Sequence, residues 1–328
     1  MNRLKNQLQT ENIYLQNVIE EVEFFENSIG KSEPLLKALY KIRQVAATET
    51  VVLLTGENGT RKKLFAKTIH NLSPRKINPF VTINCAAIPK DDIENLFFGK
   101  ARTNHTAPEQ IGKLEIANHG TLFIEDINEI SLEFQSKLLA ALQKKQYKKV
   151  GDSKLLPLDI RIIAATSQNL RELSSKVFLE DLYFYIHTFP VNIPPLRKCI
   201  VDIPMHVDSF VTQFNKKFNK NITTISKKSL ALLQNYSWPG NIKELENVIE
   251  RSVILSNTAS LKIEQLTQSP LHKKEEFLSL HGFEREYIIK VLNTTFWRVA
   301  GEKGAAKILE LHPETLRSKM RKLKIRRP

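Results

Sequence analysis

The sequence has little cysteine and no long apolar run. Cys85 and Cys199 are its only cysteines and form no CxxC or Cys/His cluster, which argues against a disulfide scaffold and against a structural zinc site. No apolar segment approaches the roughly 18 residues that a membrane span needs, and the start MNRLKNQLQTENIYLQ is predominantly polar. We therefore expect no membrane contact, no secretory signal and a cytoplasmic location.

Negative charge is scarce relative to positive charge. The 328 residues carry 49 Lys+Arg against 35 Asp+Glu, a formal net charge of +14. Residues 283–328 hold 12 basic and 5 acidic residues, so half of the net charge lies in this segment. A uniformly solvated surface would not concentrate charge in this way. The pattern favours an anionic partner for the C-terminal segment.

The remaining composition is that of a folded protein. Hydrophobic residues make up 41% and charged residues 26%, and the length allows two domains. Between residues 29 and 193, short apolar runs alternate with helical patterns, which predicts a doubly wound parallel α/β sheet. The strand candidates are Val51–Leu54, Phe80–Ile83, Thr121–Ile124 and Ile160–Ala165, and the helices between them include Lys62–Leu72 and Leu132–Lys144.

The segments on either side of this region differ from it. Residues 194–256 lack strand patterns and predict a helical lid, whereas residues 257–280 are polar and predict a linker. Residues 281–328 predict a compact all-α unit. Residues 1–28 have a helical pattern of leucines and valines. Two interpretations of that helix stay open, one that packs on its own domain and one that forms a short dimerising coiled coil.

A loop suited to phosphate follows the first strand. The segment Thr55-Gly56-Glu57-Asn58-Gly59-Thr60-Arg61-Lys62-Lys63 leads into a helix, so its N–H groups point at one place, and Lys62 can reach terminal phosphates. The pattern G-x-x-x-x-G-K-[ST] is only partly met. Arg61 stands where the last glycine is expected, and Lys63 where a hydroxyl would hold magnesium. Because that glycine lets the backbone approach phosphate, at times with positive φ, the bulky Arg61 leaves the loop conformation open.

This loop resembles the G-E-S-G-T-G-K-E loop of the AAA+ domain in sigma-54-dependent transcription activators, the bacterial enhancer-binding proteins. Four further blocks resemble the same family in order and spacing: PFVTINCAAIP at 79–89, GTLFI at 120–124, FPVNIPPLR at 189–197 and WPGNIKELEN at 238–247. The resemblance covers residues 29–255 and continues in the C-terminal unit. It implies an AAA+ α/β domain with a helical lid, followed by a small helix-turn-helix domain.

The resemblance also implies a site for ATP or ADP with Mg²⁺. The matching nucleotide-binding positions are Gly56, Glu57, Gly59, Thr60, Lys62, the sensor Thr166 and the lid residue Lys243. Glu125 and Asp126 match the acidic pair that holds Mg²⁺ and polarises the attacking water, although the family has Asp before Glu. Asn84 matches the asparagine that restrains the catalytic acid.

Several positions depart from the family. Its segment F-R-x-D-L-Y-Y-R supplies arginine fingers to the neighbouring subunit, and here Leu179 and Tyr185 stand at the two arginine positions. An arginine finger contributes on the order of 10³–10⁵ in rate, so the resemblance implies that hydrolysis is all but lost. Lys243 replaces a nucleotide-sensing arginine. Residues 101–106 lack the aromatic tip and glycines of the sigma-contacting G-A-F-T-G-A loop.

The C-terminal unit has the pattern of a helix-turn-helix. It predicts helices at 283–292, 304–310 and 313–324, and it resembles the Fis-type module that ends the same family, with Glu310 at the turn glycine. Such a module places its second helix in the major groove of double-stranded DNA, usually as a dimer. The candidates for base contacts are Glu314, Thr315, Arg317 and Ser318, and those for phosphate contacts are Lys319, Arg321, Lys322 and Lys324.

These features predict a bacterial DNA-binding transcription regulator with a degenerate AAA+ domain. It would form a homo-oligomer of two copies or more, would contact RNA polymerase or a paralogous regulator, and would act without ATP-driven remodelling of sigma-54. Nucleotide binding without turnover fits the residues that persist. Two alternatives stay open: an active ATP-hydrolysing sigma-54-dependent activator with unusual motifs, and an anti-activator scaffold that joins oligomers of an intact paralogue.

Overall fold

The computed structural model describes residues 30–101, 110–173, 177–263, 280–295, 297–301, 304–323 and 325. The chain divides into two compact units, Met1–Leu266 and Thr267–Pro328. The predictions that lie outside the described residues are the helix at 1–28, residues 102–106 of the loop at 101–106, residues 264–279 of the linker at 257–280 and the phosphate contact of Lys324. Within the described ranges, no helix is long and apolar enough to cross a membrane.

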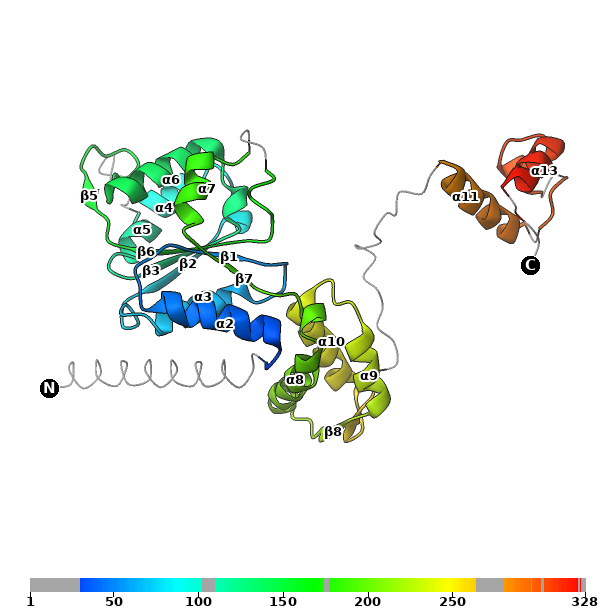
Figure 1. Ribbon diagram of the computed structural model, residues 1–328, viewed down its shortest axis with the longest axis horizontal. Coiled ribbons are helices and arrows are strands. Elements are labelled where there is room, and N and C mark those ends of the chain that lie inside the picture. The colour runs from blue at the N-terminus through cyan, green and yellow to red at the C-terminus, as the bar shows by residue number, and fades with distance from the viewer. Residues whose placement is uncertain are drawn as a thin grey trace. The chain divides into compact units, whose positions relative to one another are not determined.

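A five-stranded parallel sheet with strand order β2-β3-β6-β1-β7 forms the centre of the first unit (Figure 1). Its strands are β1 (Val52–Thr55), β2 (Phe80–Asn84), β3 (Thr121–Glu125), β6 (Arg161–Thr166) and β7 (Phe189–Asn192). Every residue of β6 is buried, as expected of a strand covered on both faces. The doubly wound α/β sheet is confirmed, and four strands begin and end within one residue of the predicted ranges.

The sequence did not predict β7. Pro190 interrupts its apolar pattern, and proline cannot donate a ladder hydrogen bond. Of the strands that the structure describes, β1 alone pairs with β7, which therefore lies at the edge of the sheet, where proline is tolerated. Its register places Asn192 beside Thr55, directly before the loop at residues 56–61.

Helices cover both faces of the sheet (Figure 1). Among the described residues, one face carries α2 (Glu33–Ala46) and α3 (Lys62–Asn71), and the other carries α4 (Ile93–Phe98), α5 (Lys113–Ile116), α6 (Leu132–Lys144) and α7 (Glu180–Ile186). Val52 and Leu54 of β1 pack in the first layer and Leu53 in the second, as alternation along a strand requires. The short elements are η1 (Cys85–Ala87), η2 (Ile127–Glu129), β4 (Gln146–Tyr147), β5 (Leu156–Pro157), η3 (Leu196–Lys198) and η4 (Ile200–Asp202).

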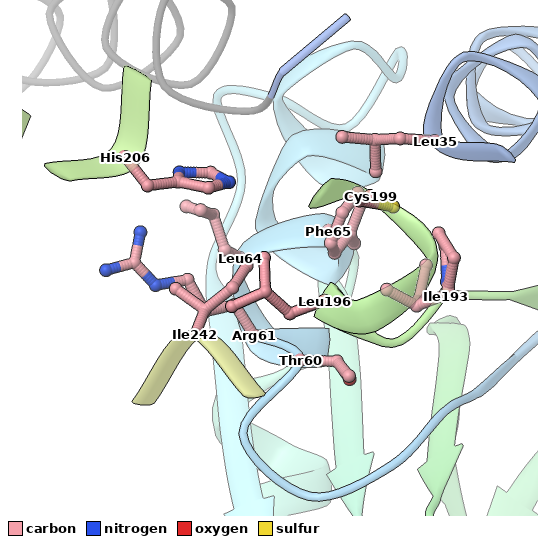
Figure 2. Close-up of a pocket in the computed structure, with 11 residues that line it drawn as sticks. Leu35, Thr60, Arg61, Leu64, Phe65, Ile193, Leu196, Cys199, His206 and Ile242 are labelled. Atoms are coloured by element: carbon pink, nitrogen blue, oxygen red, sulfur yellow. The ribbon is translucent and has the colours of Figure 1, made fainter. Parts of the chain in front are cut away.

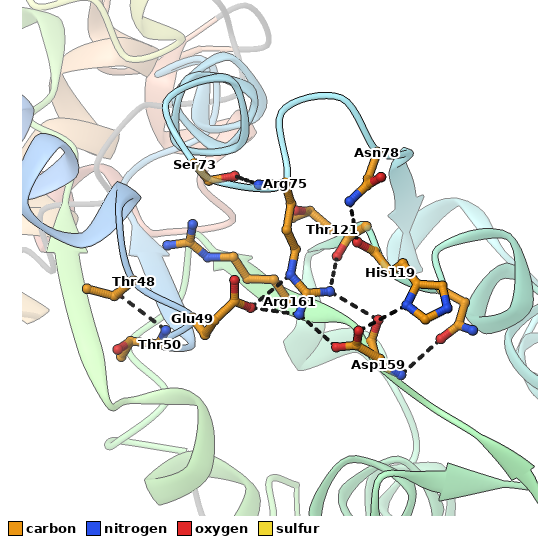
Figure 3. A network of polar contacts seen from close by, with 12 residues as sticks. Thr48, Glu49, Thr50, Ser73, Arg75, Asn78, His119, Thr121, Asp159 and Arg161 are labelled. Carbon is orange, nitrogen blue, oxygen red and sulfur yellow. Dashed lines mark hydrogen bonds and ion pairs between the residues drawn. The ribbon is translucent and has the colours of Figure 1, made fainter.

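A buried arginine joins the sheet to α2 at the amino edge of the strands. The guanidinium of Arg161 is fully buried and donates to the carbonyls of Ala46 and Val45, at 2.7 Å each. These carbonyls belong to the last turn of α2, where intrahelical partners run out. Nearby, Arg75 forms an ion pair with Asp159 at 2.7 Å (Figure 3). Arg161 therefore caps α2 from the centre of the sheet.

The helical lid follows the sheet in the chain. Its elements are α8 (Ile203–Phe218), β8 (Thr224–Ile225), α9 (Lys227–Asn235), α10 (Asn241–Leu255) and β9 (Ser260–Leu261). Trp238 is fully buried in the lid core, and its indole N–H donates to Leu233 O at 2.8 Å. The predicted linker at 257–280 begins inside the lid, because β9 pairs with β8 and the side chains of Leu261 and Ile263 are buried. Two apolar side chains in a polar stretch gave no recognisable period.

The second unit has a small core of its own. Its helices are α11 (Leu280–Thr294), α12 (Ala305–Ile308) and α13 (Pro313–Lys322). The core contains Ile288, Val291, Leu292, Ala305, Ala306, Leu316 and Ile325. Glu310 has a φ of 51°, so the turn between α12 and α13 keeps a conformation that favours glycine although glutamate occupies it. The predicted all-α unit is confirmed.

We expect Arg161→Met to lower the free energy of unfolding by roughly 2–5 kcal/mol, because it removes both donors to the end of α2 and a buried carbonyl without a partner costs about 1–3 kcal/mol. Urea unfolding followed by circular dichroism measures the change. Lys41→Met, at an exposed position of α2, is the control and should stay within about 0.5 kcal/mol of the parent protein. Equal stabilities of the two variants would contradict the capping role of Arg161.

Candidate nucleotide site and DNA-binding helix

The loop at residues 56–61, here called the phosphate loop, lies at the carboxyl edge of the sheet. The Gly56 N–H donates to Thr166 O at 3.3 Å, and the Thr60 hydroxyl donates to Glu57 O at 2.8 Å. Arg61 has φ 63° and ψ 36°, the left-handed conformation that glycine adopts easily. The loop therefore turns into α3 with an arginine in place of the glycine, at a backbone cost of about 1–2 kcal/mol.

Lys62 lies inside this loop. Its side chain is 5% exposed, and its ammonium donates to Gly56 O at 2.8 Å and to Glu57 O at 3.2 Å. Burial lowers the pKa of Lys62, whereas the negative charges of Asp126 and Glu125 raise it. The ammonium thus bonds to loop carbonyls within the electrostatic influence of the acidic pair, at the point where a terminal phosphate is expected.

The acidic pair follows β3. Glu125 ends the strand, and Asp126 follows it with a φ of 53°. Burial and the charge of Asp126 raise the pKa of Glu125, while neighbouring lysines lower it. Asn84 stands in register with Glu125 on β2, but its side-chain oxygen accepts the Ala86 N–H at 3.0 Å. Two adjacent carboxylates fit Mg²⁺, which prefers oxygen ligands, although Lys63 offers a cation where a hydroxyl ligand was expected.

The sensor candidate Thr166 already has partners within the protein. Its fully buried hydroxyl donates to Asn128 Oδ1 at 2.7 Å and accepts the Gln168 N–H at 3.0 Å. Asn128 lies on η2, just after the acidic pair, so one hydrogen bond joins the ends of β3 and β6. Asn128 was not among the predicted site residues, because nothing in the local sequence pattern indicates a partner 38 positions away.

Glu57 connects the phosphate loop to the lid. Arg197 forms a bidentate ion pair with its carboxylate, one bond of which measures 2.7 Å, and this interaction lowers the pKa of Glu57. Asn241, at the start of α10, donates its amide to Asn58 O at 2.9 Å and to Glu57 at 3.2 Å. Both Arg197 and Asn241 lie in blocks that resemble the family, and that was the only signal available for them.

Lys243 approaches the phosphate loop through its backbone. Its N–H donates to Gly59 O at 3.3 Å, whereas its side chain is 66% exposed and pairs with Glu246 at 3.2 Å. Gly59 has a φ of +79°, and a Cβ at this position would lie 2.1 Å from Gly240 O. The lid therefore presses on the loop where no side chain fits, and the Lys243 ammonium is engaged within its own helix.

An apolar pocket adjoins the loop on its lid side (Figure 2). Its lining residues are Leu35, Thr60, Arg61, Leu64, Phe65, Ile193, Pro194, Leu196, Cys199, His206 and Ile242. Burial and the charge of Arg61 lower the pKa of His206 to about 4, so this imidazole is neutral at pH 7. Figure 2 shows the Arg61 guanidinium on the side of the pocket where His206 lies, away from Leu35.

The two positions expected to hold arginine fingers lie at the ends of α7. Leu179 precedes the helix, and its N–H donates to Gln135 Oε1 at 2.6 Å. Tyr185 lies in the last turn, where burial raises the pKa of its phenol. Between them, Phe184 is 64% exposed. The two positions thus carry an aliphatic and an aromatic side chain where the resemblance expects guanidinium groups.

Helix α13 exposes most of the predicted DNA contacts. Among the candidates, the exposed ones are Glu314, Thr315, Arg317, Ser318, Arg321 and Lys322. Arg317 pairs with Glu314 at 2.5 Å, and Lys319 is partly buried and pairs with Glu284 of α11. Leu316 anchors the helix in the core, so the basic face points away from it. Lys319 would have to leave Glu284 to reach a phosphate.

Three family models match the chain in succession. The sigma-54 interaction domain matches residues 28–192, the AAA+ ATPase lid domain residues 197–278 and the Fis family of bacterial regulatory proteins residues 279–323. The chain is 38% identical over 334 residues to the formate hydrogenlyase transcriptional activator of Salmonella typhimurium, covering 99% of this chain and 48% of that relative. It is 41% identical over 252 residues to the nitrogen fixation protein VnfA of Azotobacter vinelandii, covering 76% and 48%. The chain thus spans about half the length of these relatives.

The structure is similar to that of NtrX from Brucella abortus. The ADP complex of NtrX has a TM-score of 0.70 and 28% identity, covering 99% of this chain and 76% of NtrX. The ATP complex has a TM-score of 0.69 and 28% identity, covering 97% and 75%. Because the sigma-54 interaction domain alone accounts for half of the residues, and the lid and Fis-type models follow it without overlap, the chain belongs to the family of sigma-54-dependent transcription activators.

Proposed function

We propose that this chain is a bacterial, cytoplasmic DNA-binding transcription regulator that binds nucleotide but hydrolyses it weakly or not at all. The observation that carries the proposal is the pair Leu179 and Tyr185 at the finger positions of α7. Neither side chain supplies positive charge to a phosphoryl group in a neighbouring subunit, and an arginine finger contributes on the order of 10³–10⁵ in rate. Regulation then proceeds without ATP-driven remodelling of sigma-54.

Nucleotide binding rests on the phosphate loop and the acidic pair. The N–H groups that face the start of α3 would surround the phosphates, and Lys62 would exchange its bonds to Gly56 O and Glu57 O for phosphate oxygens. Glu125 and Asp126, whose negative charges act on Lys62, would hold Mg²⁺, which when bound would neutralise phosphate charge. Thr166 would keep its hydroxyl on Asn128. NtrX has been solved with ADP and with ATP, which supports a nucleotide at the matching place.

Recognition of double-stranded DNA is assigned to α13. The Fis-type match covers this helix, and its exposed face carries Arg317, Arg321 and Lys322. The N-terminal residues of such a helix reach base edges, and the basic residues fix phosphates. Two copies on a two-fold site are the expected arrangement, and contact with RNA polymerase or a paralogous regulator would transmit the regulatory signal.

A functioning ATPase is the second candidate. Arg61 adopts the left-handed backbone conformation of the glycine it replaces, and the Lys62 ammonium bonds to the loop while the negative charges of the acidic pair act on it. These features favour a site that still handles nucleotide. The difference between the two candidates lies in turnover, which a direct assay measures.

We expect the purified full chain to bind a fluorescent ADP analogue and to release phosphate from ATP no faster than background. Lys62→Ala should abolish the binding, since it removes the ammonium inside the phosphate loop, and it should leave phosphate release unchanged. Lys76→Ala, an exposed lysine after α3, serves as the control and should bind like the parent protein. Turnover that disappears in Lys62→Ala would establish the second candidate and overturn the first.

We expect the double variant Arg317→Ala, Arg321→Ala to lose specific DNA binding. Loss of a base contact by Arg317 costs about 1–3 kcal/mol of binding free energy, and loss of a phosphate contact by Arg321 reduces the slope of log affinity against log salt concentration by about one. Fluorescence anisotropy measures this with a DNA fragment that the parent protein selects from a random pool. The double variant Lys227→Ala, Lys228→Ala removes the same charge from α9 of the lid and should bind normally. Equal affinities of the two double variants would refute the role of α13.

A further inference from the structure

The side chain of Arg61 leaves the phosphate loop toward the lid. Its guanidinium carbon lies 4.9 Å from the ring centre of Phe210 on α8, and Nη2 lies 3.9 Å from Glu246 Oε2 on α10. The side chain is 23% exposed, and burial lowers the pKa of Arg61 while Glu246 raises it. One residue of the loop thus contacts two different helices of the lid, by a cation–π and by an ionic interaction.

The glycine expected at this position could make neither contact. In this chain the left-handed backbone conformation is kept, and its cost is offset by an arginine that reaches across to the lid. Phe210 is buried at 1% exposure, so the face of its ring is shielded from water, where a cation–π contact is stronger. The neighbouring His206 is neutral at pH 7 and adds no repulsion.

Glu246 receives two cations. Besides Arg61 it pairs with Lys243, the residue at the position where a nucleotide-sensing arginine is expected. The Glu246 carboxylate therefore pairs both with a cation of the loop, Arg61, and with a cation of the lid, Lys243. This arrangement supplies, from within the chain, an anionic group that both sides of the loop–lid contact can bind.

We propose that Arg61 is a latch that keeps the lid closed on the phosphate loop without nucleotide. Closure then depends on Phe210 and Glu246 rather than on a bound phosphate. The proposal does not depend on whether the chain hydrolyses ATP. Its consequence is a first unit whose loop–lid arrangement is the same with and without bound nucleotide.

The amide of Lys243 reports this closure directly. It lies in the first turn of α10, where amides lack intrahelical acceptors, and it donates to Gly59 O across the contact. Opening of the lid breaks this bond and exposes the amide to exchange with solvent deuterium. Exchange of the peptide that contains Lys243, measured on the full chain freed of nucleotide, therefore measures the latch.

We expect this amide to be protected in the nucleotide-free parent protein and to exchange roughly tenfold faster in Arg61→Met, which keeps the backbone cost but removes the charge. Arg61→Gly should accelerate exchange as well, and Glu246→Gln should do so to a smaller degree. Arg251→Met, at an exposed position of α10, is the matched control and should match the parent protein.

Two results would overturn the latch. An unprotected Lys243 amide in the nucleotide-free parent protein would show that the lid is not closed by the chain itself. Acceleration in Arg61→Gly but not in Arg61→Met would assign the effect to loop flexibility instead of the guanidinium. Exchange in β6 verifies that each variant is folded, and Glu246→Gln decides the question if the Arg61 variants lose protection there too.

Discussion

The rest of the first unit depends on the contact between the phosphate loop and the turn that begins α10. Gly59 and Gly240 approach so closely that a Cβ on Gly59 would collide with a carbonyl oxygen. Asn241 is fully buried beside them, accepts the Leu196 N–H at 2.8 Å and donates to Asn58 O at 2.9 Å. One side chain thereby holds three segments that are far apart in the sequence. The conformation of the phosphate loop and the position of the lid are consequently coupled. A substitution in either one changes both.

This coupling explains why Arg61 is tolerated. A left-handed arginine in an isolated loop would cost about 1–2 kcal/mol with nothing to offset it. Here the Gly59–Gly240 approach and the hydrogen bonds of Asn241 align the lid with the loop, and the Arg61 contacts to Phe210 and Glu246 keep it there. A partly buried cation paired at 3.9 Å is by itself a weak source of stability, because desolvation opposes the attraction. The Arg61 contacts act mainly by favouring the closed arrangement of the lid over other arrangements, and they add little to the overall stability.

The sequence predicted the parts of this molecule that local pattern determines. Apolar runs placed four of the five sheet strands, and strand-loop-helix order placed Lys62 inside a loop. The edge strand β7 and the lid strand β9 were not predicted, because Pro190 interrupts the apolar pattern of β7 and β9 has only two residues. The hydrogen-bond and ion-pair partners of the site residues were not predicted either. Glu57 meets Arg197 across 140 positions, and periodicity carries no information about such a pairing.

The positive charge of the chain is used differently in its two units. On α13, Arg321 and Lys322 stay exposed, and the release of condensed counterions favours the binding of a polyanion to them. Around the phosphate loop the cations already have partners within the protein. Lys62 bonds to loop carbonyls, Lys243 pairs with Glu246, and Arg197 holds Glu57.

A polyphosphate that enters the loop must therefore replace existing bonds rather than fill empty ones. Each exchange contributes to the binding free energy only the difference between the new interaction and the one it replaces. The affinity for nucleotide is therefore lower than the number of nearby cations implies. The exchange at Lys62 remains favourable in kind, because phosphate oxygens are charged and the carbonyls of Gly56 and Glu57 are not. At Arg61 no such gain exists, since its partner Glu246 is already an anion. Nucleotide thus competes with the loop carbonyls for Lys62, but it does not compete effectively with Glu246 for Arg61. The contact between Arg61 and the lid therefore persists when nucleotide binds.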